Sequence, residues 1–87
     1  MPENLHHIQI KIESYGAVEK LLAHDIVMNM QKHILVKDVV EQLKALHPNA
    51  SDMLDRCACA IEDNIISRQE YLERDCILVL LSPVAGG

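Results

Sequence analysis

The chain has 87 residues and a formal net charge of −5 at pH 7, and 49% of it is hydrophobic, with no Trp or Phe. A chain of this length forms one domain without room for a large active site of its own. Its eight Lys and Arg residues form no cluster, which argues against nucleic acid or an anionic membrane as a partner.

The expected compartment is the cytoplasm. Residues 1–7 have no apolar run behind a positively charged start, and no stretch approaches the length of a membrane span. Three Cys residues are an odd number, which fits reduced thiols better than a closed disulfide framework.

The first third of the chain predicts two strands joined by a short helical segment. Ile8, Ile10 and Ile12 alternate with polar residues, which is the period-two pattern of a half-buried strand. Residues 17–23 then carry Val and Leu at helical spacing, and residues 26–30 again have strand character.

One long helix is predicted over residues 36–47. Its apolar side chains recur on one helical face, and the polar residues between them face water. These apolar positions are Val36, Val39, Val40, Leu43 and Leu46. Pro48 ends the helix, because proline cannot continue one and disfavours helical geometry before it. Residues 49–56 are expected to be a polar connection.

Three more strands are predicted in the second half of the chain. Residues 57–62 alternate as a strand, Asp63-Asn64 has the composition of a turn, and residues 65–66 start a short partner strand. Residues 67–75 are polar and irregular. Residues 76–81 are almost continuously apolar, which predicts a central strand covered on both faces.

Cys57 and Cys59, together with His47, raise the question of a metal site. A closed zinc site needs four ligands, and paired Cys ligands are usually separated by two residues rather than one. We therefore expect both thiols to fill the core as small hydrophobic groups and expect no metal site.

Five acidic residues stand near the last strand: Glu62, Asp63, Glu70, Glu73 and Asp75. Such a group is most often a solvated face of the protein. It is also a surface that a basic partner protein can meet.

The last two residues, Gly86 and Gly87, follow Pro83, Val84 and Ala85. Glycine lacks a Cβ, so a Gly-Gly end can enter a slot too narrow for side chains and place its carboxylate inside another protein. Residues left over from an engineered linker could also end in Gly-Gly, but no other linker-like or tag-like composition is present.

The order of the elements, together with the ending Leu81-Ser82-Pro83-Val84-Ala85-Gly86-Gly87, resembles the ubiquitin-like β-grasp sulfur carriers. Within that group the ending looks like that of the molybdopterin synthase small subunits, which usually finish with two aromatic residues, two prolines, Val or Ile, a small residue and Gly-Gly. The resemblance implies an α+β fold with a mixed sheet of about five strands over one main helix. Residues 1–82 would form this domain, and residues 83–87 a flexible functional tail.

The same resemblance implies chemistry at the terminal carboxylate. A ubiquitin-activating-type adenylyltransferase uses ATP to adenylate Gly87, and a sulfur donor displaces AMP to leave a thiocarboxylate. The large subunit of molybdopterin synthase then transfers that sulfur to a pterin precursor. The carrier is not catalytic alone and binds no cofactor. The residues expected to contact partners are Leu81, Pro83, Val84, Ala85 and Gly86.

Two other functions remain open from the sequence. One is the related carrier that supplies sulfur for the thiazole of thiamine, although the segment 17–23 and the Pro-Val-Ala-Gly-Gly ending favour the molybdopterin carrier. The other is a ubiquitin-like protein modifier or interaction module, in which Gly87 joins a lysine or the tail does nothing covalent.

Overall fold

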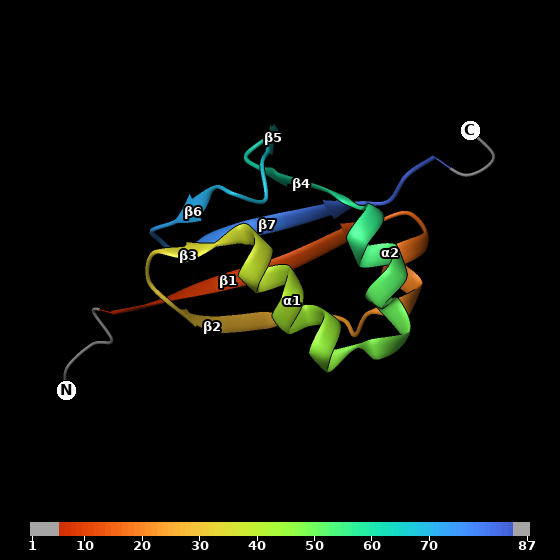
Figure 1. Ribbon diagram of the computed structural model, residues 1–87, viewed down its shortest axis with the longest axis horizontal. Coiled ribbons are helices and arrows are strands. Elements are labelled where there is room, and N and C mark those ends of the chain that lie inside the picture. Colours follow the sequence, from red (N-terminus) through yellow and green to blue (C-terminus); the bar gives the residue numbers. More distant parts are fainter. Residues whose placement is uncertain (1–5, 85–87) are drawn as a thin grey trace.

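The computed structural model describes residues 6–84, which form a five-stranded mixed sheet in the order β2-β1-β7-β4-β5 (Figure 1). The central strands β1 and β7 are parallel, and the other pairs in this sheet are antiparallel. The strands are β1 (His7–Tyr15), β2 (Val27–Gln31), β4 (Ala58–Ile61), β5 (Asn64–Ile66) and β7 (Cys76–Leu81). The α+β, ubiquitin-like β-grasp arrangement expected from the sequence is confirmed.

The core lies between one face of this sheet and α1 (Val36–Leu46). In β1 the alternating Ile8, Ile10 and Ile12 are all buried, as their spacing predicts. Four of the five apolar helix positions are fully buried, whereas Leu46 in the last turn is 58% exposed. The helix ends two residues before Pro48, in agreement with the expected effect of that proline.

The segment 49–56, expected to be a polar connection, is in fact helical. A 3₁₀ turn, η2 (Pro48–Ala50), leads into α2 (Ser51–Arg56). Ala50 and Leu54, one turn apart, are fully buried. Ala50, Met53 and Leu54 do have helical spacing in the sequence, but a segment of eight residues is shorter than the window in which such spacing identifies a helix.

The segment 67–75, expected to be irregular, also has a defined role. It contains β6 (Tyr71–Leu72), which pairs with β3 (Ile34–Leu35) in a second, two-stranded sheet. Its backbone carbonyls also accept hydrogen bonds from the first two amides of α1. The Val36 N–H donates to Glu70 O, and the Lys37 N–H donates to Arg68 O, both at 2.9 Å. Carbonyls of another segment therefore satisfy amides that the helix cannot satisfy itself.

Strand β7 is central, but it is covered on one face only, which corrects the prediction from its apolar run. Leu78 and Leu80 are fully buried beneath the helices, whereas Ile77 on the opposite face is 43% exposed. The continuous apolar pattern therefore marks a second, open apolar face rather than a second layer of helices.

Two short segments differ slightly from their predicted form. The β4–β5 turn lies at Glu62 and Asp63, one residue earlier than expected, and both have positive φ (51° and 68°) as a type I′ hairpin requires. The excursion after β1 is the 3₁₀ turn η1 (Ala17–Leu21), of which Val18 is fully buried. No helix within residues 6–84 is long and apolar enough to cross a membrane.

Candidate functional site

The predicted site residues lie at the C-terminal end of β7 and beyond it. Leu81 is the last residue of β7 and is half-buried, and Pro83 and Val84 are exposed. Val84 is 86% exposed, so most of its apolar surface is available for a contact. Ala85, Gly86 and Gly87 lie outside the described residues, so their roles stay predictions.

The strand end from which the tail (residues 83–87) departs is held against the end of β1. Leu81 pairs with Tyr15 in the parallel ladder, and the Ser82 N–H then donates to Tyr15 O at 3.1 Å. Strand β7 therefore keeps its pairing up to the residue before Pro83, which has no N–H to continue it.

The Ser82 side chain adds two further hydrogen bonds that sequence reasoning missed. Its hydroxyl donates to Tyr15 O at 2.9 Å and accepts from the Val18 N–H at 2.9 Å. A serine just before a proline at a strand end carries no signal for such a role, because its partners are more than 60 residues away in sequence.

The cysteines near the sheet behave as core side chains, as predicted. Cys57 and Cys59 are free and buried, with 5% and 2% of their surface exposed. Burial raises the pKa of both thiols above the ordinary value, which keeps them protonated and unreactive at neutral pH. Within residues 6–84, no three His, Cys, Asp or Glu side chains are placed to hold a metal ion.

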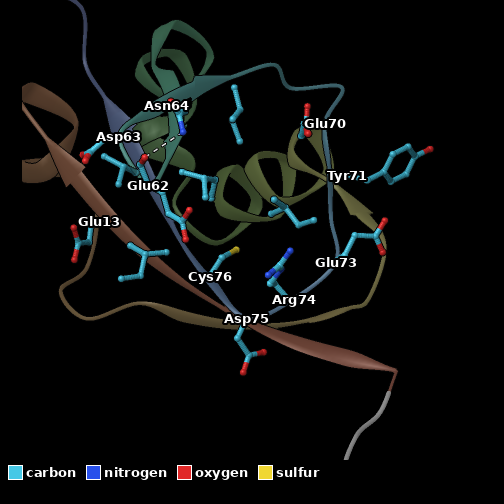
Figure 2. A pocket seen from close by; sticks show the side chains of 15 residues that line it. Glu13, Glu62, Asp63, Asn64, Glu70, Tyr71, Glu73, Arg74, Asp75 and Cys76 are labelled. Atoms are coloured by element: carbon cyan, nitrogen blue, oxygen red, sulfur yellow. Dashed lines mark hydrogen bonds between the residues drawn. The ribbon is translucent and has the colours of Figure 1, made fainter.

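A groove of about 900 Å³ opens on the face of the sheet opposite α1. Ile61, Ile66, Ile77 and Val79 provide its apolar lining. Figure 2 shows Glu62 and Asp63 of the β4–β5 turn across this groove from Glu70 and Glu73. The acidic lining residues are Glu13, Glu62, Asp63, Glu70, Glu73 and Asp75, against one cationic lining residue, Arg74. The five acidic residues singled out in the sequence therefore do gather on one surface.

One edge of the groove is tied to the turn between β2 and β3. The His33 ring stacks on Tyr71 with their centroids 4.1 Å apart, and its Nδ1 lies 2.5 Å from Glu73 Oε2. His33 N–H also donates to Leu72 O at 3.0 Å. This histidine therefore acts as a structural contact that holds the β6 segment in place.

A family model confirms the relationship that the tail and the fold indicate. The model of the ThiS family matches residues 16–87, from the turn after β1 through the Gly-Gly end. The chain belongs to the ThiS family. No curated protein sequence matches it significantly.

Solved structures related to this ThiS family member share its fold at low sequence identity. A putative molybdopterin converting factor subunit 1 from Pyrococcus furiosus is 16% identical with a TM-score of 0.76, over 88% of this chain and 99% of that one. Small archaeal modifier protein 1 from Haloferax volcanii is 13% identical with a TM-score of 0.76, over 88% of this chain and 99% of that one. Subunit 1 in a complex of molybdopterin-converting factor subunits 1 and 2 from Helicobacter pylori is another match, 18% identical with a TM-score of 0.61, over 92% and 100%. The fold is therefore that of ubiquitin-like sulfur carriers.

Proposed function

We propose that this chain is a sulfur carrier that works as the small subunit of a molybdopterin synthase. Its Gly87 carboxylate becomes a thiocarboxylate and donates sulfur to a pterin precursor. The observation that carries the proposal is the family match, which extends through Gly87. The matched region includes the tail, whose first residues, Pro83 and Val84, are exposed beyond the end of a central strand.

The chemistry follows from the reactivity of a carboxylate, which is a poor electrophile. In a separate adenylyltransferase, a carboxylate oxygen of Gly87 attacks the α-phosphorus of ATP, and pyrophosphate leaves to give an acyl adenylate. Sulfur at the sulfide level from a donor then displaces AMP and leaves the thiocarboxylate. This chain supplies the reacting carboxylate, and the proposed partners supply ATP, sulfur and catalysis.

The partners must offset the cost of ordering the tail. Fixing residues 84–87 costs on the order of 4–8 kcal/mol of conformational entropy. Val84 is the large apolar side chain of this segment, and its 86% exposure leaves most of its surface available for burial by a partner. Burying such a side chain contributes about 1.5–3 kcal/mol, so other contacts must supply the remainder.

We infer that some of these contacts involve the acidic groove. Its lining carries six carboxylates and one cation around apolar side chains. This composition suits a partner surface that presents Lys or Arg beside apolar residues. The Helicobacter pylori structure, a complex of two molybdopterin-converting factor subunits, supports a large subunit as one such partner. We place the reaction in the cytoplasm, where thiols such as Cys57 and Cys59 stay reduced.

The decisive experiment is intact-mass measurement after incubation with ATP, an activating enzyme and a sulfur source. The chain should exchange one oxygen for sulfur at its C-terminus, and the large synthase subunit should then discharge that sulfur onto the pterin precursor. Discharge onto a thiazole precursor would instead identify a thiamine carrier, and adducts with lysine would identify a protein modifier.

Gly87→Ala, or deletion of Gly87, should abolish formation of the thiocarboxylate. The fold should stay intact, because the last strand ends at Leu81. Ala85→Ser is the matched control, because it changes a small tail residue but keeps Gly-Gly, and it should be loaded normally. Normal thiocarboxylate formation by Gly87→Ala would contradict the assigned role, provided that circular dichroism shows both variants folded.

A further inference from the structure

We propose that Ser82 is a positioning residue for the sulfur-carrying end. Together with Tyr15, Gly16 and Val18 it forms a cluster, here called the tail-root clamp, that holds the departure point of the tail in one orientation. The functional part of this inference rests on the proposed function, whereas the clamp itself can be tested without any sulfur chemistry.

The clamp consists of three hydrogen bonds between Ser82 and the body of the domain. Its N–H and its hydroxyl both donate to Tyr15 O, at 3.1 and 2.9 Å. Its hydroxyl oxygen accepts from the Val18 N–H at 2.9 Å. One serine hydroxyl thus acts as donor and acceptor at once, and it joins the end of β7 to both the end of β1 and the start of η1.

This contact also provides η1 with the cap that its own sequence lacks. The N-cap position of η1 is Gly16, which has no side chain to accept an amide hydrogen bond. Val18 is fully buried, so its N–H would be costly to leave without an acceptor. Ser82 supplies that acceptor from 64 residues away in sequence, which ties the tail root to the core.

Gly16 allows Ser82 to come this close. It has φ +88° and ψ −152°, a combination that only glycine adopts readily. A Cβ built on Gly16 would lie 2.8 Å from Ser82 Cβ and 3.0 Å from Ser82 Oγ. Any side chain at position 16 would therefore push Ser82 out of its hydrogen bonds.

The consequence concerns where the reactive end can go. Five residues follow Ser82, and they span at most about 18 Å when fully extended. Pro83 restricts its own φ, so a fixed Ser82 sets the direction in which this short segment starts. If Ser82 were released, a partner would have to order about one more residue of the tail when it binds. The conformational entropy lost in ordering that residue corresponds to a loss in partner affinity on the order of tenfold.

The test compares Ser82→Ala with Ser67→Ala. Both variants lose a serine hydroxyl that accepts a backbone amide, since Ser67 Oγ accepts from Gln69 N–H at 2.9 Å, but only Ser82 lies at the tail root. Ser82→Thr keeps the hydroxyl and should restore wild-type behaviour. If Ser82→Ala does not fold, Ser82→Cys, which keeps a weaker hydrogen-bonding group, replaces it.

Two readouts are needed. In ¹⁵N relaxation measurements, the order parameter of the Val84 amide should fall in Ser82→Ala and stay unchanged in Ser67→Ala. In steady-state thiocarboxylate formation, Ser82→Ala should raise KM for the carrier on the order of tenfold with kcat unchanged, because the clamp preorganises binding and leaves the chemical step alone.

Equal Val84 order parameters in wild type and Ser82→Ala would overturn the clamp. A KM for Ser82→Ala equal to that of Ser67→Ala would overturn its positioning role. If the wild-type chain were never loaded with sulfur, the proposed function would fail instead, and the relaxation data would still decide whether Ser82 holds the tail root.

Discussion

At the scale of single residues, Gly16 combines a backbone conformation and a close contact that no other amino acid tolerates. We expect backbone strain in Gly16→Ala to lower the free energy of unfolding by roughly 1–3 kcal/mol. The close contact between the new Cβ and Ser82 Cβ should lower it further. Urea denaturation measures this change.

The double variant Gly16→Ala/Ser82→Gly separates the two contributions. It removes the Cβ contact but keeps the strained backbone at position 16, so its stability relative to Ser82→Gly reports the strain alone. A Gly16→Ala protein as stable as the wild type would show that η1 starts in a different conformation from the one described.

The buried thiols predict a second residue-scale effect, a loss of stability at alkaline pH. Burial raises the pKa of Cys59 above the ordinary 9.0, so the folded state holds a proton that the unfolded state releases. The stabilisation from the neutral thiol is therefore complete below pH 9.0 and is lost as the pH rises through the folded-state pKa.

Cys59→Ala should be less stable than wild type at neutral pH because it leaves a small cavity. Its free energy of unfolding should then fall less steeply than that of the wild type toward about pH 10.5. Urea titrations across this range provide the measurement, and Cys76→Ala should show the same kind of change, because burial also raises the pKa of this half-buried thiol. Parallel pH profiles for wild type and Cys59→Ala would refute the effect.

At the scale of elements, α2 depends on a side chain from the segment that follows β5. Arg68 Nη2 donates to the carbonyl oxygens of Leu54 and Cys57 at 2.7 and 2.8 Å, at the C-terminal end of the helix. A six-residue helix is too short to be stable by itself. This contact, the burial of Leu54 and the hydrogen bond between Lys44 and Asp55 at 2.8 Å therefore hold it in place.

Arg68→Met should destabilise the domain by about 1–3 kcal/mol, because two partly buried carbonyls lose a charged donor while the aliphatic stem is kept. The effect should concentrate in faster amide hydrogen exchange within α2. Arg68→Lys, which keeps a cationic donor, should recover part of the loss. Unchanged exchange in α2 for Arg68→Met would show that packing alone holds this helix.

At the scale of the whole molecule, α2, η1 and the tail root lie at one end of the sheet (Figure 1), and the acidic groove lies on the open face opposite α1. The open apolar face of β7 and the gathered carboxylates lie on this one surface. The tail and the groove are thus two separate regions through which partners can recognise this chain.

Reversing two groove charges, Glu62→Lys and Glu70→Lys, should slow association with a basic partner and flatten its salt dependence, because rim charges act mainly on the association rate. Stopped-flow measurements at several ionic strengths test this with the activating enzyme. The matched control is Glu19→Lys and Asp38→Lys, which makes the same change in net charge outside the groove lining. Equal association rates for the two double variants would exclude the groove as a basic-partner surface.

Local patterns in the sequence were sufficient for much of the fold. The alternation in β1 and the apolar face of α1 predicted those elements, because side-chain periodicity reflects which face meets the core. They were insufficient for α2 and β6, because six and two residues are shorter than the window in which a period identifies an element, and both segments owe their form to distant partners. The apolar run of β7 predicted its central place but not its open face.

The family relationship and the proposed reactive residue follow from the sequence, since Gly87 and the residues before it are consecutive and their chemistry does not depend on the fold. The way the tail begins and the place where the acidic residues gather depend on the folded chain. Ser82 meets Tyr15 and Val18, and Glu62 faces Glu70 across a groove, only after strands distant in sequence have paired. Such contacts follow from the order of the strands in the sheet, which the pattern within each strand does not encode.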